Sequence, residues 1–341
     1  MKCPLLFRFA RWVVPVAILT WLITGVTQQQ WNQLTSNPPN YFLLFFALVG
    51  ALAAMLLSFL RWRVLLNCLG IDITVTQVFR LGAIGYLFSF IAVGSMGGDV
   101  AKTMLLTNDH PGKRLEAIAS TVIDRLMGLY GLSLLVAFSL NLCLNEISSP
   151  ALSSFCRVVN IVAISGTVAF SVMVSGGIRS LRQVTWLDSL PLIGRMLERI
   201  IEQVRFFQSR PVALVQSLLM SISAQCLMVV SVYAIARSLY SNPGPPGIAE
   251  HFVVVPISLL AAATPLSPAG IGVFEAALDT MYSFIESEES ISGTLVGLVF
   301  QCVKLMMALA GTIFYWSSSG QSFRLFRRIG GSETAGSGEN L

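Results

Sequence analysis

Long apolar runs separated by short polar breaks make up almost the whole sequence. Six of these runs approach the roughly 20 residues that a helix needs to cross the hydrocarbon core of a bilayer. They cover residues 12–31, 41–60, 117–143, 155–175, 212–238 and 291–317. Two further apolar regions, about 75–107 and 252–285, are interrupted by breaks rich in glycine and proline. The pattern predicts an all-α polytopic integral membrane protein with about six full spans.

The distribution of lysine and arginine predicts the orientation, because cytoplasmic loops carry an excess of these residues. The segments rich in basic residues are expected in the cytoplasm: the N-terminus, 61–63, 113–114, 176–211 and the C-terminal end. The loops without lysine or arginine are expected outside: 32–40, 144–154 and 239–251. We therefore expect a multi-pass protein of the cytoplasmic (inner) membrane with both termini in the cytoplasm.

The same assignment predicts that the two interrupted regions do not cross the membrane. Both ends of region 75–107 are expected in the cytoplasm, and both ends of region 252–285 are expected outside. Each region is therefore interpreted as a re-entrant helical hairpin. The order of elements then forms a four-plus-four inverted repeat, about 12–144 and 155–317, which is a plan that many secondary transporters use.

Composition excludes several other classes of protein. Apolar residues make up 55% of the chain and charged residues 11%, whereas a soluble domain has about 25% charged residues. We expect a single transmembrane domain over residues 1–330, with an amphipathic cytoplasmic linker at about 176–211 and a disordered tail at 331–341. The net charge of +5 comes from short basic clusters between apolar runs, so nucleic acid is not an expected partner. The six cysteines stand singly, which predicts no metal site and no cofactor.

Each break in an interrupted region presents a new helix N-terminus at membrane depth. Four glycines at the breaks permit positive φ and close backbone approach: Gly97, Gly98, Gly270 and Gly272. Asp99 at the first break, and Ser267 followed by Pro268 at the second, match the residues that cap a helix N-terminus. Unpaired N–H groups at such a terminus bind anions, and the abundant anion of a bilayer is the headgroup phosphate. The alternative is that both breaks are capped turns that only permit tight packing.

Charged side chains within the apolar regions are candidate headgroup-binding residues, since each costs about 2.5–3.5 kcal/mol at a helix centre. The basic candidates for the phosphate are Lys102, Arg125 and Lys304. The acidic candidates, Asp99, Asp124 and Glu275, can balance them or hold the amine of a cationic headgroup. The alternative is a set of internal ion pairs that fix helix packing.

Four segments, in this order, carry a resemblance to a known family: Arg61-Trp62-Arg63, Gly97–Lys102, Asp124–Leu129 and Thr264–Glu275. They resemble the lysylphosphatidylglycerol synthase transmembrane-region family, also called the flippase-like domain, over about residues 5–328. The resemblance implies the membrane part that takes part in moving aminoacylated phosphatidylglycerol between leaflets, without the aminoacyltransferase of the best-known members. Lys102 stands where arginine is frequent in that family, and stand-alone relatives act in different lipid pathways, so the substrate does not carry over.

These observations lead us to expect a flippase-like lipid translocase, and not an enzyme, that moves a phosphate-bearing lipid between leaflets. Its expected partners are a membrane phospholipid or another lipid, together with a second copy of the chain or a separate lipid-modifying enzyme. One alternative is a membrane-embedded enzyme acting on lipid-linked phosphate or sugar. The two histidines, His110 and His251, form no pattern with serine or aspartate that would favour it. Another alternative is a structural partner in envelope lipid biogenesis.

Overall fold

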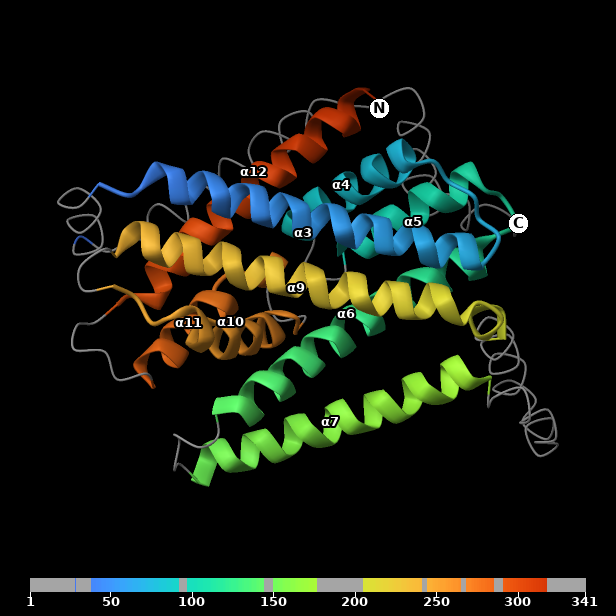
Figure 1. Ribbon diagram of the computed structural model, residues 1–341. Helices are drawn as coiled ribbons and strands as arrows, with labels where there is room; N and C mark the ends of the chain where they lie inside the picture. The colour runs from blue at the N-terminus through green and yellow to red at the C-terminus, as the bar shows by residue number, and fades with distance from the viewer. Residues whose placement is uncertain are drawn as a thin grey trace, which may run out of the picture.

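The computed structural model describes residue 28 and seven longer segments: 38–91, 97–143, 150–176, 205–240, 244–264, 268–284 and 291–317. Every regular element within these segments is a helix (Figure 1). In chain order they are α3 (Tyr41–Cys68), α4 (Val75–Ile91), α5 (Gly97–Asp109), α6 (Arg114–Cys143), α7 (Pro150–Ser175), α9 (Pro211–Leu239), α10 (Ile248–Ala262), the 3-10 turn η4 (Pro268–Gly270), α11 (Val273–Ser283) and α12 (Gly293–Ser317). The predicted all-α class is confirmed for this part of the chain.

Among the described residues, four helices are long and apolar enough to cross a membrane. They are α3, α6 over Arg114–Leu142, α7 over Cys156–Ser175, and α9. Helix α10 and the Gly293–Leu309 part of α12 are apolar but shorter. Four of the predicted spans correspond to the long helices, and the protein is therefore a multi-pass membrane protein. The predicted span at 12–31, apart from residue 28, lies outside the described residues, as do most of the linker and the tail.

Helices α3 and α9 form a central antiparallel pair (Figure 1). At the end where α3 begins, Asn40 N donates to Ser238 O over 3.1 Å, and the Ser238 hydroxyl donates to Asn40 O over 2.9 Å. At the end where α3 finishes, Arg210 Nη1 donates to Asn67 O over 2.8 Å. Asn40 also caps α3 through its side chain, and Pro211 at the first position starts α9, as the preferences of helix termini lead us to expect.

The two interrupted regions open toward opposite ends of this pair. Helices α4 and α5 are antiparallel, and Lys113 after α5 donates to the carbonyl of Gly70 before α4. The loop between α3 and α4 and the loop between α5 and α6 therefore both lie at the end where α3 finishes. For the second region, Ser292 N donates to the hydroxyl of Tyr240 over 3.1 Å. This bond brings the start of α12 to the end of α9, where α3 begins, and α10 and α11 extend from there (Figure 1).

Helix α4 joins the two regions. On one side it packs against α5 at the contact of Gly85 with Gly98. On another side Leu87 and Phe90 pack with residues of the second break and α12 in one buried cluster. The two breaks therefore lie on different sides of the same helix.

The second break differs from its predicted form. The sequence predicts a helix that begins at Pro268 after a Ser267 cap. The structure instead has a 3-10 turn over Pro268–Gly270, and α11 begins at Val273. The reason is the backbone: Ala269, Gly270 and Gly272 have φ values of 50°, 74° and 84°, which an α-helix does not contain. Ser267 itself lies outside the described residues.

Candidate functional site

Five charged side chains from three helices form what we call the charge network: Arg61, Asp99, Lys102, Asp124 and Arg125. Arg61 Nε lies 2.8 Å from Asp124 Oδ1, and Lys102 Nζ lies 3.7 Å from the other oxygen of Asp124. Lys102 Nζ is also 2.8 Å from Asp99 Oδ1, and Arg125 Nε donates to Asp99 Oδ2. The carboxylates thus alternate with the cations, and α3, α5 and α6 are tied together.

Two members of the charge network, Arg61 and Asp124, are buried in the helix bundle, and the other three are partly buried. The side chains of Arg61 and Asp124 are 8% and 9% exposed, and those of Lys102, Asp99 and Arg125 are 12%, 20% and 33% exposed. At 1.5 Å per residue, Arg61 lies about 10 Å from the end of α3, and Asp124 lies about 15 Å from the start of α6. Helices of this length exceed the roughly 30 Å hydrocarbon core by a few ångströms at each end. With each helix centred on the core, the network lies a few ångströms inside the apolar layer.

Small residues bring the network together. At Gly98 an added Cβ would collide with the Gly85 carbonyl and the Ser89 hydroxyl, so only glycine lets α5 approach α4 this closely. Gly128 faces the guanidinium of Arg61, and a Cβ added at Gly128 would stand 3.3 Å from Arg61 Nη1. The guanidinium thus packs in the place that a side chain at Gly128 would need. The close approach at both glycines sets the distance of α5 and α6 from their neighbours.

Polar and aromatic partners hold the network from outside. The Lys102 ammonium lies 4.7 Å from the centre of the Trp62 ring, a cation–π contact, and the indole N–H of Trp62 donates to Ser120 Oγ over 3.2 Å. Arg61 Nη1 donates to the hydroxyl of Ser221 on α9. Such partners fix the side chains of a buried ionic cluster in one arrangement.

The second break has a polar group of its own. The Glu275 carboxylate accepts a hydrogen bond from Gly272 N over 2.7 Å through Oε2 and so caps α11. Lys304 Nζ on α12 donates to Ala269 O in the η4 turn over 2.9 Å. An added Cβ at Gly297 would stand 2.8 Å from Glu275 Cγ, so α12 and α11 touch at this glycine. At Gly270 it would stand 2.9 Å from the Ala262 side chain, which closes the turn against α10.

The predicted site residues therefore form two groups on different sides of α4. The first group contains Gly97, Gly98, Asp99, Lys102, Asp124 and Arg125. The second contains Gly270, Gly272, Glu275 and Lys304. Asp99 lies in the first turn of α5 as expected, but its carboxylate oxygens pair with Lys102 and Arg125. The single phosphate site expected from Lys102, Arg125 and Lys304 is thus divided between the two groups.

Sequence reasoning missed two residues that the structure connects to these groups. In the sequence, Arg61 serves as an orientation signal and as part of a family-like segment, but not as a candidate site residue, and in the structure it pairs with Asp124. Gln301 carries no pattern in the sequence, yet it is fully buried on the face of α12 that contains Lys304. Their distances from the neighbouring helix ends, about 10 Å for Arg61 and about 15 Å for Asp124, could have linked the two residues.

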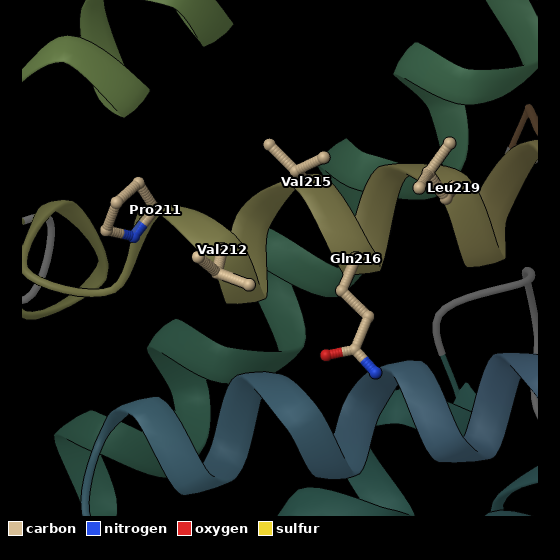
Figure 2. Close-up of a pocket in the computed structure, with 5 residues that line it drawn as sticks. All are labelled: Pro211, Val212, Val215, Gln216 and Leu219. Atoms are coloured by element: carbon tan, nitrogen blue, oxygen red, sulfur yellow. The ribbon is translucent and has the colours of Figure 1, made fainter.

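A groove on α9 lies apart from both groups. Figure 2 shows its lining: Pro211, Val212, Val215, Gln216 and Leu219. The side chains of Val212 and Leu219 are largely exposed, and Gln216 is the one polar side chain among the five. Such a lining suits the acyl chains of surrounding lipid and offers too few polar groups to hold a headgroup.

Comparison with known proteins supplies a family. The model of the family described as the lysylphosphatidylglycerol synthase TM region matches residues 9–311. The chain therefore belongs to this family, and the resemblance seen in the sequence is confirmed. Neither the curated proteins nor the solved structures contain a significant match.

Proposed function

Because the chain belongs to a family of membrane regions from lipid-modifying proteins, we propose that it moves a phosphate-bearing lipid between the two leaflets of the cytoplasmic membrane. The headgroup contacts the charge network on its way, while the acyl chains stay in the lipid. The protein acts as a transporter in this proposal, and the chemistry of the lipid is carried out elsewhere. Family membership supports the lipid-related role, and the geometry of the network supports transport.

The observation that carries the proposal is an imbalance of charge. The network contains three cations and two carboxylates. A surplus positive charge within the apolar layer is unfavourable unless an anion balances it. A headgroup phosphate supplies that anion, and arginine binds its oxygens with strong, charge-assisted hydrogen bonds.

The exposed fractions indicate where the phosphate enters. Arg125 is the most exposed member of the network at 33%, and Asp99 follows at 20%. Arg61 and Asp124 lie deeper. A phosphate that approaches Arg125 therefore meets Asp99 as a competitor for the same guanidinium, and displacement of Asp99 is the step that admits the headgroup.

The arrangement of the interrupted regions supports a transport cycle. Pairs α4–α5 and α10–α11 open toward opposite ends of the α3–α9 pair. We interpret them as the two re-entrant hairpins of an inverted repeat. In transporters of this plan, the substrate site lies between the repeats, and the repeats rock to expose it to alternate sides. Helix α4 contacts Gly98 of the first break and residues of the second break. A movement of one hairpin is therefore transmitted to the other through α4.

The proposal is tested by lipid scrambling in proteoliposomes that contain a trace of fluorescent anionic phospholipid. We expect the wild-type protein to move the lipid faster than protein-free liposomes do, and Arg125→Gln to lower that rate about tenfold or more. This factor follows from the loss of one charge-assisted contact, about 1.5–3 kcal/mol. Arg114→Gln is the matched control, since Arg114 is an exposed arginine at the start of the same helix.

Thermal unfolding of the same variants separates transport from packing. If Arg125→Gln scrambles lipid normally and unfolds at a lower temperature, the network only holds helices together. The protein would then be better described as a structural partner in lipid biogenesis.

A further inference from the structure

Two charged side chains from neighbouring helices hold the backbone of the second break. Glu275 Oε2 accepts a hydrogen bond from Gly272 N over 2.7 Å at the start of α11, and Lys304 Nζ donates to Ala269 O in the η4 turn over 2.9 Å. Hydrogen bonds to a charged group are about twice as strong as those between neutral groups. The form of the break therefore depends on the charges of Glu275 and Lys304.

The backbone that these bonds hold is strained. Ala269 has a φ of 50°, which residues with a side chain rarely adopt, and Gly270 and Gly272 follow with φ values of 74° and 84°. Such a conformation persists only where the surrounding structure holds it, and it is frequent at switch regions. Removing the charge of one of the two holding side chains should therefore change the shape of the break.

Two buried oxygens beside the break have no hydrogen-bond donor. Within the described part of the chain, neither Glu275 Oε1 nor the amide oxygen of Gln301 has a partner, and the two residues are 4% and 0% exposed. Gln301 lies one turn along α12 from Gly297, and its side chain leans back toward that glycine, where Glu275 packs. A proton on Glu275 Oε1 turns one of the two acceptors into a donor.

The packing beside Glu275 suits a proton and not a larger ligand. A Cβ added at Gly297 would stand 2.8 Å from Glu275 Cγ, so the Glu275 side chain fills the place between α11 and α12. A metal ion there would also face the Lys304 ammonium, which already binds the break. Buried carboxylates of membrane transporters commonly serve as proton relays.

An exposed carboxylate connects Glu275 to the end of the bundle where α3 begins. Asp279 lies one turn from Glu275 on α11, is exposed, and accepts from Thr294 N over 3.0 Å. His251 instead pairs with the Tyr282 hydroxyl over 2.7 Å, near the end of α11. The remaining charged or titratable side chains on the described parts of the elements packed against α11 and the η4 turn are Glu250 on α10, Cys302 and Lys304 on α12, and Arg80 and Tyr86 on α4.

We propose that Glu275 is the proton-binding site that couples lipid movement to a proton gradient. The proposal rests on the proposed function and adds to it the ion that drives transport. A proton from the acidic side binds the Glu275 carboxylate, forms an O–H bond at Oε1, and is later released to the other side. Protonation weakens the bond from Gly272 N to Oε2, which frees the start of α11 and lets the second hairpin move.

Electrostatics makes the proton and the lipid phosphate favour each other. Protonation of Glu275 leaves the Lys304 ammonium unbalanced in the apolar layer, about 16 Å from the start of α12. The charge network on the other side of α4 has one surplus positive charge until a phosphate binds. A phosphate in the network therefore favours the proton at Glu275, and the proton favours the phosphate to the same extent. The two should move in the same direction.

The test imposes a pH gradient on proteoliposomes that contain a trace of fluorescent phosphatidylglycerol, while potassium and valinomycin hold the membrane potential at zero. A membrane-impermeant quencher measures the share of probe in the outer leaflet. With one proton per lipid, a gradient of about one pH unit should enrich the probe about tenfold in the leaflet that faces the alkaline side. Glu275→Gln keeps an acceptor for Gly272 N but cannot ionise, and should leave the probe evenly distributed. Glu250→Gln, which alters an exposed glutamate in the first turn of α10, should keep the enrichment.

An even distribution in the wild type, with lipid moving faster than in protein-free liposomes, would overturn proton coupling and leave the proposed function standing. Enrichment that persists in Glu275→Gln would overturn the assignment to Glu275. Enrichment driven by a sodium gradient at equal pH, and not by the pH gradient, would overturn the choice of ion.

If the wild type moves no lipid, the proposed function fails, and hydrogen exchange of the purified protein decides the proton site separately. Amide exchange over 268–275, corrected for its intrinsic dependence on pH, should vary with pH in the wild type and in Glu250→Gln. In Glu275→Gln it should not vary. The same dependence in Glu275→Gln, or none in the wild type, would overturn the site.

Discussion

Arg61 Nε lies 2.8 Å from Asp124 Oδ1, although the two residues are 63 positions apart in the sequence. The same guanidinium donates to Ser221 on α9. One buried arginine therefore connects α3 with α6 and α9. Lys102 on α5 lies beside the other oxygen of Asp124. This connection holds the helices around the charge network.

Removing one partner of this pair should destabilise the protein strongly. Arg61→Met leaves the buried Asp124 carboxylate without its closest cation, and the loss of one member of a buried pair costs about 3–5 kcal/mol. Replacing both residues, in Arg61→Met with Asp124→Leu, removes the unpaired charge and should recover most of the stability. The free energy of unfolding in mild detergent measures both effects. A double variant that is no more stable than Arg61→Met alone would contradict this account.

A matched pair of glycines tests the turn at the second break. Gly270 and Gly272 both have positive φ, so alanine costs about 1–2 kcal/mol of backbone strain at either position. An added Cβ at Gly270 also stands 2.9 Å from the Ala262 side chain, whereas nothing lies within 4 Å at Gly272. We therefore expect Gly270→Ala to lower the melting temperature more than Gly272→Ala. Equal shifts would mean that the turn is not packed tightly against α10.

Helix α7 should depend on hydrogen bonds for its position against α6. Asn141 Nδ2 donates to Asn160 Oδ1 over 2.9 Å, and Tyr130 Oη donates to Thr167 Oγ1 over 3.0 Å. Much of the remaining surface of α7 is apolar and exposed. A double-mutant cycle with Asn141→Leu and Asn160→Leu should give a coupling of roughly 0.6 kcal/mol, the average for such bonds between membrane helices. Additive losses of stability would show that the two amides do not cooperate.

The sequence predicts the helices of this fold better than their contacts. Apolar runs and capping residues such as Asn40 determine where a helix can begin, and these signals are local. The partner of Arg61 depends instead on the distance between α3 and α6, which glycines such as Gly128 set through packing. The turn at Pro268 was mispredicted because Ala269 adopts positive φ, which no local preference of alanine indicates. Gln301 looks like any polar residue in an apolar helix until its neighbours are known.

The topology can be tested at described, exposed positions. In a cysteine-free background, Asn40→Cys and Glu250→Cys should react with a membrane-impermeant maleimide added from outside. Asp72→Cys and Ser209→Cys, at the opposite end of the α3–α9 pair, should react only after the membrane is permeabilised. The positive-inside rule assigns this second end to the cytoplasm. Labelling of position 72 from outside would reverse the orientation, and labelling of 40 and 72 from the same side would mean that α3 does not cross the membrane.

Asp99 should compete with the lipid phosphate for Lys102 and Arg125, since its carboxylate pairs with both side chains. Asp99→Asn raises the surplus in the charge network from one positive charge to two, and so strengthens the attraction for an anion. We expect the purified variant to retain several times more anionic phospholipid than the wild type, and Arg125→Gln to retain less. The amount bound per protein is measured by mass spectrometry after mild-detergent purification.

Asp99→Asn should also release its lipid slowly, because the Asp99 carboxylate that displaces the phosphate is gone. Scrambling by Asp99→Asn should therefore fall even though binding is tighter, whereas Arg125→Gln should lose both binding and scrambling. A structural ion pair predicts a different result. Asp99→Asn would then lower stability with no gain in bound anionic lipid, and removing the charge of Arg125 as well would restore the stability. That outcome would exclude competition between Asp99 and the phosphate as the step that admits the headgroup.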